Sequence, residues 1–300
     1  METTNLEQVR VIFGEADSAL RTTLTPQLSA EGFSPDHIMG TDRIADIREA
    51  VDGDRADLVV CDAELADGTF GELIHQIRHH EIGDNPFVGT ITMIPTAEKQ
   101  SIMASIDSGT DDVLIKPITG AQFMERFKLL TRERTPFVVT TDYIGPNRRK
   151  AHRPGTVKIP EFQVPNPLKA KVDGAYEKSR MQAEIHALVE VFNEQKIERH
   201  AYQIVYLIEH MLPVDLEGGV KEAALDEIDR LWWVANDISH RVADTRYAEW
   251  DVLCRSLVEA VGRVRKNATA PEPKDLDSLR NLAGVFKYQA SPAEKLAQSG

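Results

Sequence analysis

The stretch Leu58-Val59-Val60-Cys61-Asp62 is a run of apolar residues that ends in a single carboxylate. A near-continuous apolar run of this length fits a parallel strand that is covered on both faces. In open α/β sheets, ligands bind beyond the carboxyl ends of the strands. Asp62 therefore lies where such a sheet carries its chemistry.

Two further apolar runs end in charged residues in the same way. Val11-Ile12-Phe13-Gly14 leads into Glu15 and Asp17, and Val113-Leu114-Ile115 leads into Lys116-Pro117. The carboxyl ends of parallel strands meet at one edge of a sheet, so these strands would bring acids and a lysine together. We therefore expect one charged cluster at that edge.

Strand and helix patterns alternate along the first 134 residues. Strands are predicted at residues 9–14, 35–39, 58–62, 87–94 and 112–116. The segments that follow them carry apolar residues at helical spacing, as in Phe70, Leu73, Ile74 and Ile77. Five such units predict an α/β fold over residues 7–134, a five-stranded doubly wound parallel sheet of the flavodoxin-like type.

The chain changes character after residue 134. Residues 135–173 carry many prolines and a basic cluster at 148–153, which excludes a long helix and predicts a linker with some order around residues 137–139. Residues 174–290 instead repeat apolar residues at alternating spacings of four and three, as in Ile197, Ala201, Ile204, Ile208 and Met211. Such a stripe must be buried against other helices, so we predict an all-α helical bundle there.

Composition narrows the class of protein. The formal net charge of −13 disfavours nucleic-acid binding, because phosphate backbones are recognised by basic surfaces. The chain has two cysteines and no apolar stretch long enough to span a bilayer. We expect a cytoplasmic protein that neither binds a membrane nor relies on disulfides.

The front domain resembles the receiver domain of two-component response regulators. The resemblance rests on Glu15-Ala16-Asp17 after the first strand, on Asp62 after the third, and on the stretch from Asp107 to Pro117. In that stretch a glycine stands seven residues before a Lys-Pro pair, with adjacent acids between them. The resemblance covers residues 7–134, and the helical half matches no family that we recognise.

The resemblance implies a chemistry for each of these residues. Asp62 would accept a phosphoryl group from a histidine of a partner kinase or phosphotransfer protein. The protein would then signal through this covalent modification, and we do not expect it to be an enzyme. Glu15, Asp17 and Asp62 would hold Mg²⁺, which favours oxygen ligands. Lys116 would contact a phosphoryl oxygen, and Pro117 would follow a cis peptide bond. A hydroxyl from Thr92 or Thr96 would also bind the phosphoryl group.

The sequence departs from the family pattern in three ways. At the end of the fourth strand, the best register places Met93 or Ile94 where the family has a hydroxyl residue, with Thr92 and Thr96 on either side. The family has a pair of adjacent acids after the first strand, whereas this chain has Glu15 and Ala16, which weakens the expected Mg²⁺ site. The aromatic residue expected three positions before the lysine is Val113. A valine cannot make the large rotamer change through which that aromatic residue reports phosphorylation.

Three functions remain open from the sequence. The first is a response regulator that relays phosphorylation of Asp62 through a helical region, which would bind a protein partner or a second copy of the chain. The second is a receiver-shaped scaffold that binds protein partners without being phosphorylated, as Ala16 and Val113 would allow. The third makes the helical half a histidine phosphotransfer module acting through His240.

Overall fold

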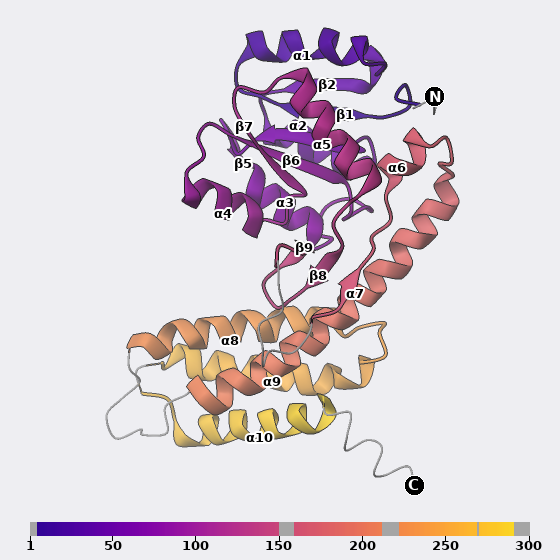
Figure 1. Cartoon of the computed structure of the whole chain (residues 1–300). Coiled ribbons are helices and arrows are strands. Elements are labelled where there is room, and N and C mark those ends of the chain that lie inside the picture. The colour runs from indigo at the N-terminus through magenta and orange to yellow at the C-terminus, as the bar shows by residue number, and fades with distance from the viewer. Residues whose placement is uncertain (1–4, 150–158, 212–221, 269, 291–300) are drawn as a thin grey trace. The chain divides into compact units, whose positions relative to one another are not determined.

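The structure is a computed structural model that describes residues 5–149, 159–211, 222–268 and 270–290 (Figure 1). The chain divides into two compact units, residues 1–189 and residues 190–300. We describe each unit separately.

The first unit contains a five-stranded parallel sheet in the order β2-β1-β3-β6-β7. Every neighbouring pair is parallel, and Asp62 at the end of β3 lies in register with Met93 of β6. This order is that of the flavodoxin-like doubly wound sheet, which confirms the predicted fold. The strands are β1 (Val11–Gly14), β2 (Ile38–Thr41), β3 (Leu58–Asp62), β6 (Gly89–Ile94) and β7 (Asp112–Ile115).

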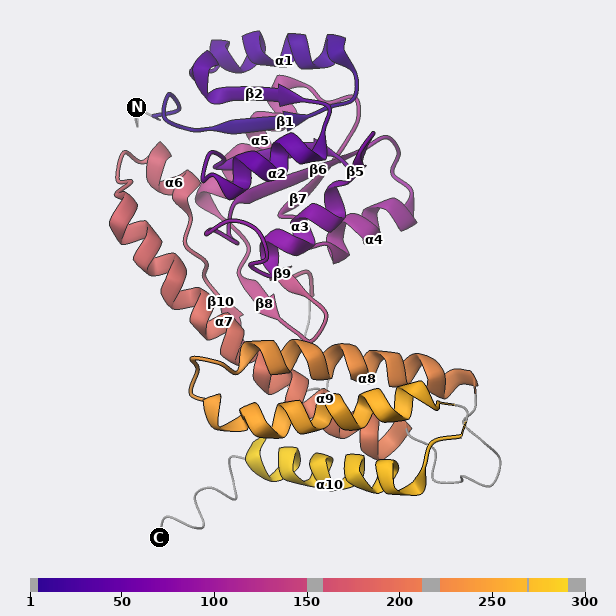
Figure 2. The same ribbon diagram turned by 180° about the vertical axis from the view of Figure 1, so that it is seen from behind.

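Helices cover both faces of this sheet. They are α1 (Ser18–Ala30), α2 (Ile44–Asp52), α3 (Phe70–Arg78), α4 (Lys99–Asp107) and α5 (Gly120–Arg132). Alternate residues of β3 point to opposite faces: Leu58 and Val60 pack with α1 and α5, and Val59 and Cys61 pack with α2 and α3. Figure 1 shows α5 in front of the sheet, and Figure 2 shows α2 and α3 on the other face.

The strand predicted at residues 35–39 begins later than expected. Pro35 opens a short 3₁₀ helix, η1 (Pro35–His37), and β2 starts only at Ile38. Proline fixes φ and lacks a backbone donor, so it favours this turn over a strand that pairs with β1. A small hairpin of β4 (Glu64–Leu65) and β5 (Gly68–Thr69) links β3 to α3.

The segment predicted as a linker contains ordered structure. It forms a second, antiparallel sheet in the order β10-β8-β9, followed by α6 (Pro167–Val172). Its strands are β8 (Phe137–Val139), β9 (Ile144–Pro146) and β10 (Glu161–Phe162). Residues 150–158, which hold most of the basic cluster, lie outside the described residues.

Buried contacts explain why this proline-rich segment orders on the first unit. The Phe137 ring lies 5.1 Å from the guanidinium carbons of both Arg78 and Arg134. The ammonium of Lys171 in α6 lies 2.7 Å from the buried Asp57 carboxylate. Tertiary contacts of this kind compensate for short strands that have little stability of their own.

The division between the two units falls within a helix. α7 (Lys178–Tyr206) spans residues 189 and 190, whereas the sequence placed the start of the helical region at residue 174. The boundaries of functional domains at 134 and 173 therefore stay predictions.

The second unit is helical, as predicted. It holds the end of α7, η2 (Leu207–Met211), α8 (Glu222–Arg241), η4 (Ala248–Trp250), α9 (Asp251–Lys266) and α10 (Pro273–Ala290). The predicted stripe of Ile197, Ala201, Ile204 and Ile208 is buried in its core, while the side chain of Met211 lies outside the description. His240 is exposed on α8, where its Nδ1 lies 2.8 Å from the Asn236 carbonyl oxygen. Among the described residues, no helix is both long and apolar enough to cross a membrane.

Candidate functional site

Three of the predicted site residues converge at the carboxyl edge of the parallel sheet. The Lys116 ammonium lies 2.7 Å from a Glu15 carboxylate oxygen and 2.9 Å from Asp62 Oδ1. These side chains come from the ends of β1, β3 and β7, so the sheet order brings them together. The peptide bond between Lys116 and Pro117 is cis, as expected.

Backbone groups hold the two carboxylates in place. The Ala16 N–H donates to Asp62 Oδ2 at 3.2 Å, and the Asp17 N–H donates to Glu15 Oε1 at 3.0 Å. Glu15 is 2% exposed and Asp62 is 8% exposed, so neither carboxylate is well solvated. Ala16 therefore contributes a backbone donor at the position where the family pattern has an acid.

The charge balance of the cluster perturbs its titration. Burial raises the pKa of Asp62, and the neighbouring Glu15 carboxylate raises it further, against the opposing effect of Lys116 and the Ala16 N–H. Burial alone would lower the pKa of Lys116, but its hydrogen bonds to Glu15 and Asp62 outweigh burial and raise it. Two acids thus share one permanent cation, an arrangement that favours binding of a further cation.

Asp17 does not take the predicted place in the cluster. Its side chain is exposed and caps α1, accepting hydrogen bonds from the backbone N–H groups of Ala19 and Leu20. Among the described residues, the carboxylate oxygens of Glu15, Asp17 and Asp62 do not all lie within 4.8 Å of one another. An aspartate that precedes a helix satisfies its free N–H groups, which explains this position.

The predicted hydroxyl residues also lie elsewhere. Thr92 is buried and pairs with Cys61, one position before the partner of Asp62, and its hydroxyl donates to Thr110 Oγ1 at 3.1 Å. Thr96 is exposed and is not among the described residues that line the cavity beside Asp62. Neither Thr92 nor Thr96 is therefore among the described residues that line the cavity beside Asp62, and a role for either in phosphoryl binding stays a prediction.

A cavity of about 270 Å³ opens beside Asp62 and Lys116. Met93, Ile94 and Pro95 form its apolar wall, and Ser101 of α4 supplies a hydroxyl that sequence reasoning missed. Only the fold of the loop after β6 brings Ser101 here, so no strand-end pattern could have identified it. The cavity therefore has an apolar side and a charged side.

Val113 lies on the edge strand β7 in register with Thr92 and is partly buried. Its two methyl groups can occupy only staggered positions close to the backbone. This position therefore lacks a side chain that could swing between the cavity and solvent.

The sequence is similar to response regulators over its front part. No protein-family model matches the chain. It is 30% identical over 131 residues to the response regulator MprA of Mycolicibacterium vanbaalenii, covering 43% of this chain and 52% of that protein. It is 26% identical over 130 residues to the transcriptional regulatory protein CseB of Streptomyces coelicolor, covering 42% and 50%. The chain thus spans about half the length of these curated relatives.

Solved structures align with the same part of the chain. A two-component response regulator from Clostridium difficile aligns at 24% identity with a TM-score of 0.37, covering 42% of this chain and 98% of that one. The receiver domain of a sensor histidine kinase from Pseudomonas aeruginosa, described with a magnesium ion in its active-site cleft, aligns at 18% identity with a TM-score of 0.35, covering 39% and 93%.

Proposed function

We propose that the receiver domain in the front part of the chain accepts a phosphoryl group on Asp62. The donor is a phosphohistidine of a partner kinase or histidine phosphotransfer protein. The observation that carries the proposal is the contact of Lys116 with both Asp62 and Glu15 at the rim of a cavity. This contact sets an ammonium beside the oxygen that would react.

The proposed transfer exchanges one phosphorus bond for another. An Asp62 carboxylate oxygen attacks the phosphorus atom, and the bond between phosphorus and the donor imidazole nitrogen breaks. The electron pair of that bond goes to the imidazole nitrogen. The leaving imidazole is neutral if its other nitrogen already carries a proton, and otherwise it takes a proton from water. Phosphoryl transfer depends on position and on neutralisation of charge, and Lys116 supplies one positive charge against the phosphoryl oxygens.

The residues present fit a magnesium ion. Glu15 and Asp62 offer carboxylate oxygens, and one or two carboxylates suffice because Mg²⁺ keeps several of its waters. When bound, the ion would neutralise charge on the phosphoryl group. Asp17 caps α1 and is not needed as a ligand of the ion. Glu15 is one methylene longer than aspartate, and its carboxylate contacts Lys116.

Incubation of the full-length protein with Mg²⁺ and a small phosphodonor tests the proposal. We expect intact-mass measurement to show the addition of one phosphoryl group, and Asp62→Asn to abolish it. Asp36→Asn, which alters an exposed acid of η1, is the matched control and should be phosphorylated normally. A wild-type protein that gains no phosphoryl group, or an Asp62→Asn protein that gains one, would contradict the assignment.

The second unit is proposed as the output region. Its buried core belongs to a helical bundle of its own, so it can bind a cytoplasmic protein partner or a second copy of the chain while remaining folded. Phosphorylation of Asp62 would change that binding. Size measurement of the full-length protein before and after phosphorylation reports whether a second copy is the partner.

A scaffold that is never phosphorylated is the second candidate. Ala16 and Val113 favour it. Ala16 stands where the family pattern has a carboxylate, and Val113 stands where it has the aromatic residue that reports phosphorylation. Ala16→Asp separates the two candidates. A large gain in Mg²⁺ affinity, together with phosphorylation that only this variant shows, supports the scaffold; little change in either supports a working site in which Glu15 compensates.

A further inference from the structure

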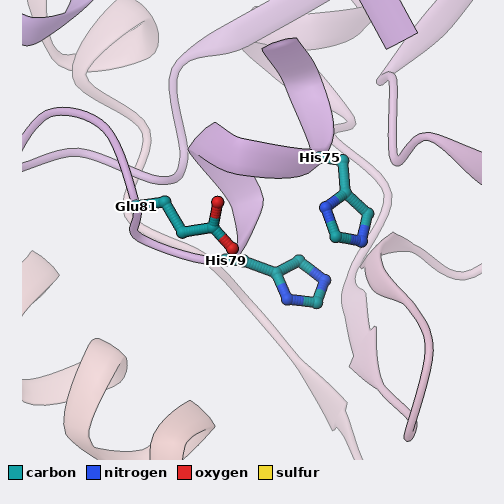
Figure 3. A group of neighbouring side chains, drawn as sticks. All are labelled: His75, His79 and Glu81. Atoms are coloured by element: carbon teal, nitrogen blue, oxygen red, sulfur yellow. The ribbon is translucent and has the colours of Figure 1, made fainter. Parts of the chain in front are cut away.

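A second group of metal-ligand side chains lies at the far end of α3, away from the phosphorylation site. His75, His79 and Glu81 each offer one ligand atom, and these three atoms lie within 4.8 Å of one another. Figure 3 shows the two imidazoles facing each other and the Glu81 carboxylate turned toward His79. We propose that these residues bind one divalent transition-metal ion of the Zn²⁺ class.

Helix geometry places the two histidines on one face. Residues four apart on a helix are neighbours, and the His75 and His79 rings stack with their centroids 3.9 Å apart and their planes 18° from parallel. His79 is the residue at which α3 ends, and its N–H still donates to the His75 carbonyl oxygen at 3.0 Å. The backbone therefore keeps the two histidines one helical turn apart whether or not an ion is bound.

The turn after α3 brings the carboxylate back to this face. His80 adopts a positive φ of 59°, its N–H donates to the Ile77 carbonyl, and the Glu81 N–H donates to the Gln76 carbonyl. These two bonds form a Schellman turn, which reverses the chain direction directly after the helix. Without that reversal, Glu81 would continue away from the histidines.

Charge and exposure at this position suit a cation. The carboxyl end of a helix carries partial negative charge, which stabilises a positive ion. His75 and Glu81 are exposed and His79 is partly buried, so an ion reaches the ligands from solvent and keeps water in its remaining coordination position. Two imidazoles and one carboxylate with an open position form a ligand set that Zn²⁺ accepts.

The ligand types separate this site from the one at Asp62. Mg²⁺ favours oxygen ligands, whereas imidazole nitrogen selects Zn²⁺, Cu²⁺ or Ni²⁺. The two sites lie toward opposite ends of α3, whose nine residues span about 13 Å. Binding at one site is therefore measurable without filling the other.

Titration of metal-free, full-length protein with Zn²⁺ against a chromophoric chelator tests the proposal. We expect the wild type to bind one equivalent that His75→Ala no longer binds, and Glu81→Gln to bind it at least about tenfold more weakly, since even outer contacts of a metal site change affinity by that factor. His75 is exposed, so His75→Ala leaves the core intact, which circular dichroism verifies.

Three controls keep the result specific. His80→Asn alters a neighbouring imidazole outside the group, His186→Ala alters an exposed histidine of α7, and Asp62→Asn alters the other site. Each should retain the full equivalent. Equal Zn²⁺ stoichiometry and affinity in the wild type and His75→Ala, or no uptake by the wild type, would overturn the proposal and leave the two rings as a stacked pair.

Discussion

The two edges of the parallel sheet carry charged clusters of opposite balance. At the carboxyl edge, Glu15 and Asp62 share the single ammonium of Lys116. At the amino edge, the buried Asp111 carboxylate binds the guanidinium groups of both Arg78 and Arg134. The first cluster has more acids than bases and lies beside a cavity, whereas the second has more bases than acids and is largely buried.

The titration of the acids follows this balance. Burial opposes ionisation of Asp111, but Arg134 and Arg78 outweigh it and lower its pKa. The same holds for Asp57, where hydrogen bonds from Arg10 and Lys171 lower the pKa against burial. Asp62 shares its single cation, Lys116, with Glu15, and its pKa is raised instead. The pKa of the same residue type is thus lowered at one edge and raised at the other.

The largest expected effect comes from removing the acid of the amino edge. Asp111→Ala leaves Arg78, whose side chain is fully buried, and Arg134 without their carboxylate. Loss of one member of a buried ion pair costs about 3–5 kcal/mol, so the free energy of unfolding of the first unit should fall by that amount. Calorimetry of the full-length protein measures it.

A double variant sharpens this result. Asp111→Ala leaves two guanidinium groups without their carboxylate, and Arg134→Met removes one of them. The double variant should therefore recover part of the stability that Asp111→Ala loses. Two losses that simply add would show that the ion pair between Asp111 and Arg134 is not coupled.

At the carboxyl edge, we expect the corresponding change to affect the proposed reaction. Lys116→Met removes the only side-chain cation that contacts Asp62 in the described structure. Removal of one donor to developing charge typically costs about a hundredfold in rate. We expect that loss in phosphorylation by a small phosphodonor. Lys128→Met on α5 is the matched control, and equal rates in both variants would remove Lys116 from the mechanism.

Replacement of Asp62 and of Asp57 by asparagine should change the unfolding midpoint in opposite directions at neutral pH. A raised pKa means that ionised Asp62 makes the folded state less stable as pH rises, so Asp62→Asn should raise the unfolding midpoint at pH 7. A lowered pKa means that ionised Asp57 stabilises the folded state, so Asp57→Asn should lower the midpoint. Both differences should shrink in acid, below the ordinary carboxyl pKa of about 4.

Equilibrium urea unfolding at a series of pH values measures this contrast. The first unit must be followed separately, for example by hydrogen exchange of the peptides of β3 and β6, because two units need not unfold together. A fall in the midpoint of Asp62→Asn at pH 7 would contradict the raised pKa.

The smallest expected effect is a shift in a pH profile. Only the ionised Asp62 carboxylate attacks phosphorus, so the rate of phosphorylation should fall as pH drops through its raised pKa. Glu15→Gln removes the neighbouring acid that contributes to that shift, and the midpoint should move to lower pH. Stopped assays at graded pH would show it; an unmoved midpoint would leave burial as the sole cause.

The strands and the charged cluster at the carboxyl edge were predictable, because local patterns in the sequence specify both. The apolar run before Asp62 and the run before Lys116 each specify a buried strand, and parallel order then places their ends together. The position of Asp17 was not predictable from the same pattern, because an acid after a strand serves equally well as the cap of the next helix. Ser101 was missed because its place depends on how a loop folds.

The sequence predicted some order at β8, but the pairing of β8 with β9 could not be predicted, for a different reason. Its strands are short and include Pro146, so neither periodicity nor composition distinguishes them from a linker. Contacts distant in sequence, above all those of Phe137 with Arg78 and Arg134, stabilise them. Only the three-dimensional structure reveals those contacts.

Gly109, the glycine that precedes the Lys-Pro pair, supports this hairpin directly. It has a φ of +92°, and a methyl group added to it would lie 2.6 Å from the Ile144 carbonyl oxygen of β9. The Arg148 guanidinium also donates to the Asp111 carbonyl oxygen at 2.6 Å. A fragment that ends at residue 134 would expose the backbone around Gly109 and Asp111 to water. A shorter protein built from the front part of the chain should therefore continue through Val172, and a chimaera that replaces the helical region should keep the hairpin.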